Sequence, residues 1–266
     1  MPDLDRITKE LNHRYRVRGS FIRPVRMERG FAMRIRTSQL QMSESFWTIT
    51  CLTLSGAYQD AYSYFARGKV FANAQTGNIV LMAAKFAEGD FLGILHYLFP
   101  IIAFACGIAA AAGIHRRYKH SGFHWRQGIL VIEILLLMCT PWIGNDSLAN
   151  CLVSFACALQ VQSFRKVHGF PFASTMCIGN LRSMMDHLVQ VKGPQGREHK
   201  AIAFSYFRIL MTFMIGAGIG KAACDAWGLN AIYGSCLFLV TALLFMFYDP
   251  RILKKERIQE IDEAVL

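Results

Sequence analysis

The most visible pattern in this chain is a series of long apolar blocks separated by short polar and basic stretches. A helix needs about 20 apolar residues to cross roughly 30 Å of hydrocarbon, and the blocks have about that length. They therefore predict six membrane-spanning helices, over residues 46–66, 92–114, 127–143, 148–164, 201–222 and 229–248.

Two further segments, 70–88 and 172–190, are apolar but interrupted by Asn, Gln, Thr, Gly and Arg. The string F-A-N-A-Q-T-G-N, which starts at Phe71, resembles F-A-S-T-M-C-I-G-N, which starts at Phe172. The two Gly-Asn pairs lie 102 residues apart, and the same shift carries most apolar blocks of the first half onto those of the second. The chain is therefore expected to contain two repeats, each a span, a Gly-Asn segment and two more spans.

The composition agrees with a membrane protein. The chain is 53% hydrophobic and only 18% charged, with a mean hydropathy of +0.29, whereas soluble domains are about a quarter charged. The net charge of +11 comes from basic residues in the first 40 positions and between the apolar blocks, as the positive-inside rule describes. Because no nucleic-acid-binding motif is present, we expect no nucleic acid partner.

The loop charges distinguish two topologies. If the Gly-Asn segments cross the membrane, there are eight spans, and the basic residues of 115–120 and 165–166 face outward, against the charge rule. If each segment enters and leaves on one side, there are six spans, and these residues and both termini are cytoplasmic. The second topology fits better and predicts an all-α integral membrane protein with two re-entrant half-helices. Because each half then has three spans, the repeats are inverted, as in many secondary transporters.

The chain divides into a basic tail (1–44), a first membrane repeat (45–144), a second membrane repeat (145–249) and a charged tail (250–266). The N-terminal tail has no apolar core of a signal peptide, and we expect it to rest on anionic lipid headgroups in the cytoplasm. The eight cysteines are scattered without a C-x-x-C pair, so no disulfide framework is expected.

The Gly-Asn segments are the natural place for a binding site, because non-helical backbone at membrane depth is tolerated only where it is buried or lines a cavity. Amides and hydroxyls supply donors and acceptors there, and glycine allows a ligand to approach closely. Alternatively, these groups cap the two half-helices and hydrogen-bond one another across the pseudo-twofold axis. The candidate substrate-binding residues are Asp60, Asn73, Gln75, Thr76, Gly77, Asn78, Thr175, Gly179, Asn180 and Arg182.

Two acidic residues lie within predicted spans, where an ionisable group is costly and a functional candidate. Asp60 is expected to carry a proton or cation, to pair with Arg182 or Arg208, or to lie near the outer headgroups. Glu133 is a coupling carboxylate, a polar contact between helices, or a group at shallow depth in the membrane. Arg182 can also pair with Asp186 one turn later on its own helix, or these residues lie on a solvated end of the half-helix, which we favour.

Small residues form stripes in two corresponding spans, at Ala103, Gly107 and Ala111 and at Gly216 and Gly220. They predict close helix packing, with the two stripes facing each other. No phosphate-binding loop, nucleophile elbow, dinucleotide fingerprint or H-E-x-x-H motif is present, and the histidines of 115–124 have no Cys or carboxylate nearby. We therefore expect no catalytic residues, no metal and no cofactor.

The sequence from Ser55 to Tyr64, the string V-F-A-N-A-Q-T-G-N after it and the second motif through Arg182 resemble the YoaK-like family of bacterial membrane proteins, catalogued as domain of unknown function 1275. The resemblance covers roughly residues 45–248 and implies a multi-pass protein of the bacterial inner membrane, without implying an activity. Gln59 departs from a position that is usually apolar in the family, and Ile178 from one that is usually Thr.

The leading interpretation is a small-solute permease or secondary transporter with its site at the repeat interface and with Asp60 coupling to protons. One alternative is a membrane scaffold that recruits lipids or partners through its basic tail. Another is an intramembrane enzyme acting on lipids, which requires Asp60, Glu133 or His187 to converge in one cavity.

Overall fold

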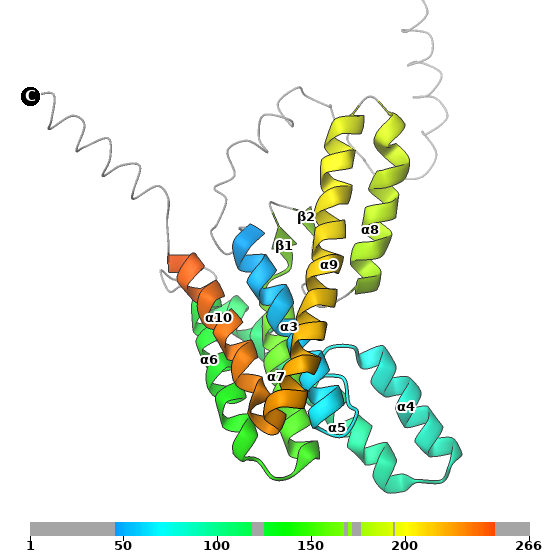
Figure 1. Ribbon diagram of the computed structural model, residues 1–266, viewed down its shortest axis with the longest axis vertical. Coiled ribbons are helices and arrows are strands. Elements are labelled where there is room, and N and C mark those ends of the chain that lie inside the picture. Colours follow the sequence, from blue (N-terminus) through cyan, green and yellow to red (C-terminus); the bar gives the residue numbers. More distant parts are fainter. Residues whose placement is uncertain (1–45, 119–124, 168–169, 172–176, 194, 248–266) are drawn as a thin grey trace, which may run out of the picture. The chain divides into compact units, whose positions relative to one another are not determined.

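The computed structural model describes residues 46–118, 125–167, 170–171, 177–193 and 195–247, and the two tails 1–44 and 250–266 lie outside the described residues (Figure 1). The described chain is almost entirely helical. Its strands are the two-residue pair β1 (Lys166–Val167) and β2 (Phe170–Pro171), which run antiparallel.

The helices begin and end close to the predicted blocks. The six long or medium helices are α3 (Phe46–Ala66), α5 (Phe91–Tyr118), α6 (Trp125–Cys139), α7 (Asp146–Ser163), α9 (Gly196–Trp227) and α10 (Ile232–Phe247). The Gly-Asn segments form the shorter helices α4 (Gln75–Ala87) and α8 (Cys177–Val189). Each of these has 13 residues and is about 20 Å long, less than the roughly 30 Å of a hydrocarbon core. Single turns of 3₁₀-helix lie at η2 (Thr140–Trp142), η3 (Gln190–Lys192) and η4 (Gly228–Ala231).

Local signals explain several helix ends. The chain leaves α3 through Gly68 and Lys69, both with positive φ, and turns from α4 into α5 at Gly89, which also has positive φ. The side chain of Asn145 caps α7 by accepting a hydrogen bond from the N–H of Leu148 at 3.1 Å. The turns at Gly68, Lys69 and Gly89 thus end α3 and α4, and the cap at Asn145 marks the start of α7, the first helix of the second half.

The helices pair across the two halves of the sequence. In the first half, α3 packs along α9 and α10 of the second half; in the second half, α7 packs along α5 and α6 of the first (Figure 1). The short helices pack within their own halves, α4 on α5 and α8 on α9, and α6 meets α10. Each contact between two halves therefore has a counterpart with the roles of the halves exchanged.

Glycines allow the closest of these crossings. A Cβ built on Gly216 in α9 would lie 2.7 Å from the carbonyl oxygen of Leu54 in α3, and one on Gly107 in α5 would lie 2.6 Å from that of Phe155 in α7. The prediction of close packing is confirmed, but the prediction that the two stripes face each other is wrong. Each stripe packs on the first helix of the opposite half, because a glycine is needed where the backbone of α3 or α7 comes nearest.

The described surface and core have unusual polarity. Large apolar side chains are exposed on nearly every helix, among them Val80, Phe86, Leu92, Trp142, Ile178, Val189, Leu237 and Leu244. The core, in contrast, holds many polar groups, including Ser55, Gln59, Asp60, Arg67, Asn78, Glu133, Asn150, Gln160 and Ser235. Soluble proteins rarely expose large apolar patches, and they bury few polar groups that are not hydrogen-bonded.

Two described stretches are long and apolar enough to cross a membrane: Phe91–Tyr118, and Gly196–Phe247, where α9, η4 and α10 follow without a break. A core helix of a soluble protein passes the same test, but such a helix is mostly buried. Only 22% and 33% of the two windows are buried here.

Candidate functional site

A cluster of polar side chains lies where α3 crosses the helices of both halves. Its centre is Gln59, whose Nε2 lies 3.0 Å from Ser55 Oγ, 3.0 Å from Ser235 Oγ and 3.1 Å from Glu133 Oε1. Ser55 and Gln59 stand one turn apart on α3, so both face the same neighbours, while Glu133 comes from α6 and Ser235 from α10. All four are fully buried.

The cluster continues toward the loop between α3 and α4. Gln59 Oε1 accepts a hydrogen bond from Cys157 Sγ of α7, and Asn73 Nδ2 donates to that sulfur at 3.2 Å and to the Gly56 carbonyl at 3.2 Å. The backbone N–H of Asn73 in turn donates to Asp60 Oδ1 at 2.7 Å. A continuous path of hydrogen bonds therefore joins two acidic side chains that are 73 residues apart in sequence. We call Ser55, Gln59, Asp60, Asn73, Glu133, Cys157 and Ser235 the central polar cluster.

Two oxygens of the cluster have no hydrogen-bond partner within the described chain. They are Oε2 of Glu133 and Oδ1 of Asn73. Within the same residues neither Asp60 nor Glu133 forms an ion pair. Because buried polar groups are nearly always hydrogen-bonded, these oxygens mark where the cluster can accept a proton or a donor from a ligand.

Asp60 lies beside the start of α4. Besides the amide of Asn73, the backbone amides of Ala72 and Ala74 also interact with its carboxyl group. The N-terminus of a helix favours negative charge, which gives this buried carboxyl a physical reason for its position. Asp60 and Asn73 are thus two predicted site residues that the structure brings together.

The first Gly-Asn motif closes its own loop. Asn78 accepts a hydrogen bond from the N–H of Phe71 at 2.9 Å and donates to the carbonyl of the same residue at 2.7 Å. Asn78 also donates to Gln75 Oε1 at 2.8 Å, and Gln75 donates to the Ala72 carbonyl at 2.8 Å. Both side chains therefore hold the loop that precedes α4. Asn78 itself lies in the first turn of α4, three residues after the helix begins at Gln75.

The rest of that motif also has local contacts. A Cβ on Gly77 would lie 2.8 Å from the ring of Phe71, which stacks on Tyr64 with ring centroids 4.6 Å apart. Thr76 is exposed. Gly77 is thus required for the aromatic packing of the loop, and Thr76 lies away from the central polar cluster.

The second motif is only partly described. Thr175 lies outside the described residues, Asn180 is buried near the start of α8, and Gly179 is exposed. Arg182 is exposed and lies 3.9 Å from Asp186 one turn later, as the alternative pairing predicted. The side chain of Arg208 is near the ring of Phe204, at 6.0 Å from its centroid. Neither arginine forms an ion pair with Asp60 in the described structure, because each lies on the exposed side of its helix.

The buried cation of the fold is a residue that the sequence did not single out. Arg67 follows α3 directly and is fully buried. Its guanidinium donates to the hydroxyl of Tyr62 at 3.0 Å, to the carbonyls of Thr140 and Ile143 at 2.7 and 2.8 Å, and to Asp146 at 3.0 Å. In the sequence, Arg67 is one of several basic residues that follow apolar blocks. No local pattern predicts that it contacts residues more than 70 positions away.

His187 does not join the acidic residues. Its Nδ1 lies 2.8 Å from Nδ1 of His199, and its ring is stacked near Tyr206 of α9. His187 is not among the described contacts of Asp60 and Glu133, which both belong to the central polar cluster. A group of three His, Cys, Asp or Glu side chains placed to hold a metal ion is likewise not found in the described part of the chain.

Comparison with known proteins adds a family assignment. A family model described as "Protein of unknown function (DUF1275)" matches residues 48–245. A search of curated proteins and a search of solved structures each found no match. The matched region runs from α3 to α10 and includes the central polar cluster, Arg67 and both Gly-Asn motifs. Because the match extends over well more than half of the chain, the protein belongs to the DUF1275 family.

Proposed function

We propose that this protein is an integral membrane permease that moves a small solute past the central polar cluster, with a proton exchanged at its buried carboxyl groups. The single observation that carries the proposal is the hydrogen-bonded path from Glu133 through Gln59, Cys157 and Asn73 to Asp60. Ionisable groups inside membrane segments are rare and mark ion or proton pathways.

The polarity of the helices supports placement in a bilayer. Exposed apolar side chains are unfavourable in water but favourable in contact with lipid. In a bilayer the buried polar groups also have no water to compete for their hydrogen bonds. On this placement the six longer helices are spans and the 13-residue helices α4 and α8 are the re-entrant elements. The bacterial inner membrane, with both termini in the cytoplasm, follows from the family resemblance and from the loop charges.

The exchange of partners between the two halves supports inverted repeats. Leu54 and Ala57 of α3 lie against Gly216 of the second half. Phe155 and Ala158 of α7, each 101 residues later in the sequence, lie against Gly107 of the first half. With three spans in each half, two such halves have opposite orientation. The central polar cluster then lies where the first helices of the repeats meet, which is where inverted-repeat transporters place their sites.

The hydrogen-bond acceptors of the cluster favour a class of solute. Two acidic groups lie in it, and neither has an ion-pair partner within the described chain, since Arg67 is bound to Asp146. A small cation or a neutral solute rich in hydrogen-bond donors suits these acceptors, and an anion does not. Asn73 is the predicted ligand that already combines contact with Asp60 and an unpartnered oxygen. The remaining predicted residues, Gln75, Thr76, Gly77, Asn78, Thr175, Gly179, Asn180 and Arg182, would act by shaping the two half-helices beside it.

Proteoliposomes containing a pH-sensitive dye test the proposal. A panel of small organic cations is added outside, with sugars and carboxylates as comparison solutes, and the internal pH is followed. We expect a cation-dependent pH change that falls to background in Asp60→Asn and in Glu133→Gln.

The matched controls are Asp225→Asn and Glu88→Gln, because these exposed residues pair with lysines on the surface. Both controls should retain the flux. Equal flux in all four variants, each inserted and folded, would remove the central polar cluster from the transport path.

A further inference from the structure

Two adjoining depressions lie at the start of α9, beside α8. One has a volume of about 560 Å³, and its apolar lining is Met184, Leu188, Ala201, Ala203, Phe204 and Phe207. The other has a volume of about 550 Å³ and is formed by the η3–α9 turn, including Gly193, Gln195 and Glu198. Both volumes are in the range of small-molecule sites. Arg197 and Lys200 line both depressions, so two cations stand at the junction of an apolar groove and a polar one.

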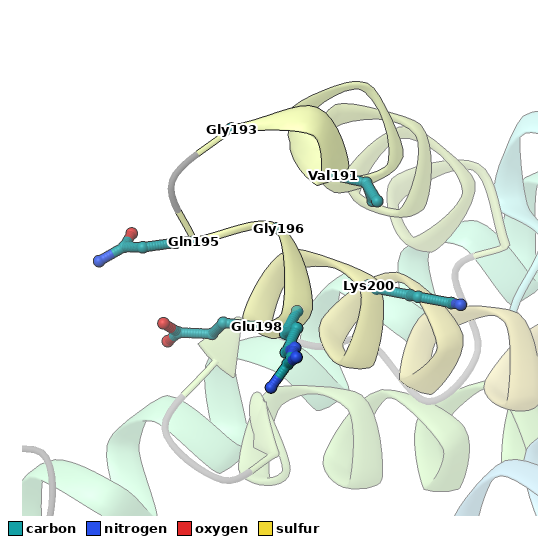
Figure 2. Close-up of a pocket in the computed structure, with 7 residues that line it drawn as sticks. Val191, Gly193, Gln195, Gly196, Glu198 and Lys200 are labelled. Atoms are coloured by element: carbon teal, nitrogen blue, oxygen red, sulfur yellow. The ribbon is translucent and has the colours of Figure 1, made fainter.

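The cations are available at this junction. Arg197 and Lys200 are exposed, and neither lies within ion-pair distance of an acidic group in the described chain, including the neighbouring Glu198. In Figure 2, Glu198 and Gln195 point to one side of the helix start, whereas Lys200 points to the other. Their positive charge is therefore not neutralised locally.

The apolar groove runs along α9 from Lys200 toward the middle of that helix. Phe204 lies one turn after Lys200, about 6 Å along the axis, and Phe207 lies about 10 Å along. The rings of Phe204 and Phe207 are stacked, with centroids 6.3 Å apart, and both are exposed. With α9 placed as a membrane span, as proposed above, two cations near its start followed by aromatic side chains along its axis match an amphiphile with a negative head and an apolar tail.

We propose that this groove binds one anionic phospholipid, with its phosphate between Arg197 and Lys200 and an acyl chain along Leu188, Phe204 and Phe207. The residues of this site are different from those of the central polar cluster. It rests on the membrane placement proposed above but not on solute transport. The charge rule places the α8–α9 turn on the cytoplasmic side, where anionic lipids give the membrane a negative surface.

Native mass spectrometry of the full-length protein, released from detergent containing phosphatidylglycerol or phosphatidylcholine, measures the bound lipid. We expect retained phosphatidylglycerol to fall roughly twenty-five-fold in the double variant Arg197→Gln/Lys200→Gln, since each basic residue at an anionic surface contributes about fivefold. The control Arg116→Gln/Lys192→Gln makes the same charge change at exposed residues that do not line the groove, and it should retain the lipid. Phosphatidylcholine should bind weakly throughout.

A third variant tests the acyl-chain half of the site. Leu188→Trp fills the apolar groove and leaves both cations in place, so it should also release phosphatidylglycerol. Equal loss in the groove and control double variants would show general surface attraction and overturn the site. If Leu188→Trp retained phosphatidylglycerol, the groove would not be the binding site of the acyl chain. The transport variants Asp60→Asn and Glu133→Gln should bind the lipid normally, so failure of transport and failure of this site are distinguishable.

Discussion

The crossing of α9 on α3 should tolerate the substitution Gly218→Ala but not the substitution Gly216→Ala. A Cβ on Gly216 would lie 2.7 Å from the Leu54 carbonyl oxygen and 3.0 Å from Ala57 Cβ, whereas a Cβ on Gly218 meets no described atom within 4 Å. Both glycines are inside the same helix, so Gly218→Ala is a matched control for Gly216→Ala.

The magnitude follows from the contact. The clashing oxygen belongs to the backbone of α3, so relief requires the two helices to separate by about half an ångström, and such overpacking costs about 1–3 kcal/mol. Replacing glycine by alanine in a helix contributes about 1 kcal/mol of stability at either position. This gain cancels when the two variants are compared, so Gly216→Ala should be about 1–3 kcal/mol less stable than Gly218→Ala. For a domain of this size the difference corresponds to roughly 2–12 °C in Tm.

Thermal unfolding of the purified protein in detergent, followed by loss of the monodisperse species, measures the difference. The counterpart crossing of α5 on α7 supplies an independent repeat, with Gly107→Ala as the test and Gly113→Ala as its control, because a Cβ on Gly107 would lie 2.6 Å from Phe155 O and one on Gly113 meets no described atom within 4 Å. If Gly216→Ala raised the Tm as much as Gly218→Ala, the close crossing would be refuted.

Three further predictions follow from the contacts. Arg67→Lys should lower stability by about 3 kcal/mol or more, since one ammonium group cannot reproduce the fork that contacts four partners, and chemical unfolding of both proteins measures the loss. Asn78→Asp keeps the acceptor for the N–H of Phe71 but loses the donor to its carbonyl, so it should destabilise by about 1–3 kcal/mol, and a Tm equal to wild type would contradict the loop-closing role. The hydrogen bond from the N–H of Gly93, helped by Lys85, lowers the pKa of Asp90, so its charge stabilises the fold above the ordinary pKa of Asp, and this contribution is lost as the pH falls through the lowered value. The Tm of Asp90→Asn, which retains the helix cap, should therefore approach that of wild type as the pH falls from neutral through the ordinary pKa of Asp and below it, and a constant difference would argue against the charge effect.

The candidate site was only partly predictable. The sequence predicts Asp60 as an ionisable group within a span and Asn73 as a donor and acceptor in the first Gly-Asn segment, and the two residues do meet. For Glu133 the sequence leaves open a coupling group, a contact between helices or a shallow position, and the structure shows a contact with Gln59 of another helix. The family resemblance had marked Gln59 only as an unusual polar residue. Its role as the centre of the cluster depends on α6, α7 and α10 all reaching the same turn of α3.

By itself, the sequence determined the helices and their approximate ends, because runs of apolar residues and the turn residues between them act over one or two helical turns. It also indicated two related halves, since the Gly-Asn motifs recur in order. Only the tertiary structure decided which helices pair and which polar groups meet. The contacts of Gln59 with Glu133 and of Arg67 with Asp146 join residues 74 and 79 positions apart. Such partners are set by the crossings that glycines permit, and the backbone of α3 or α7 that each glycine meets lies in the other half of the chain.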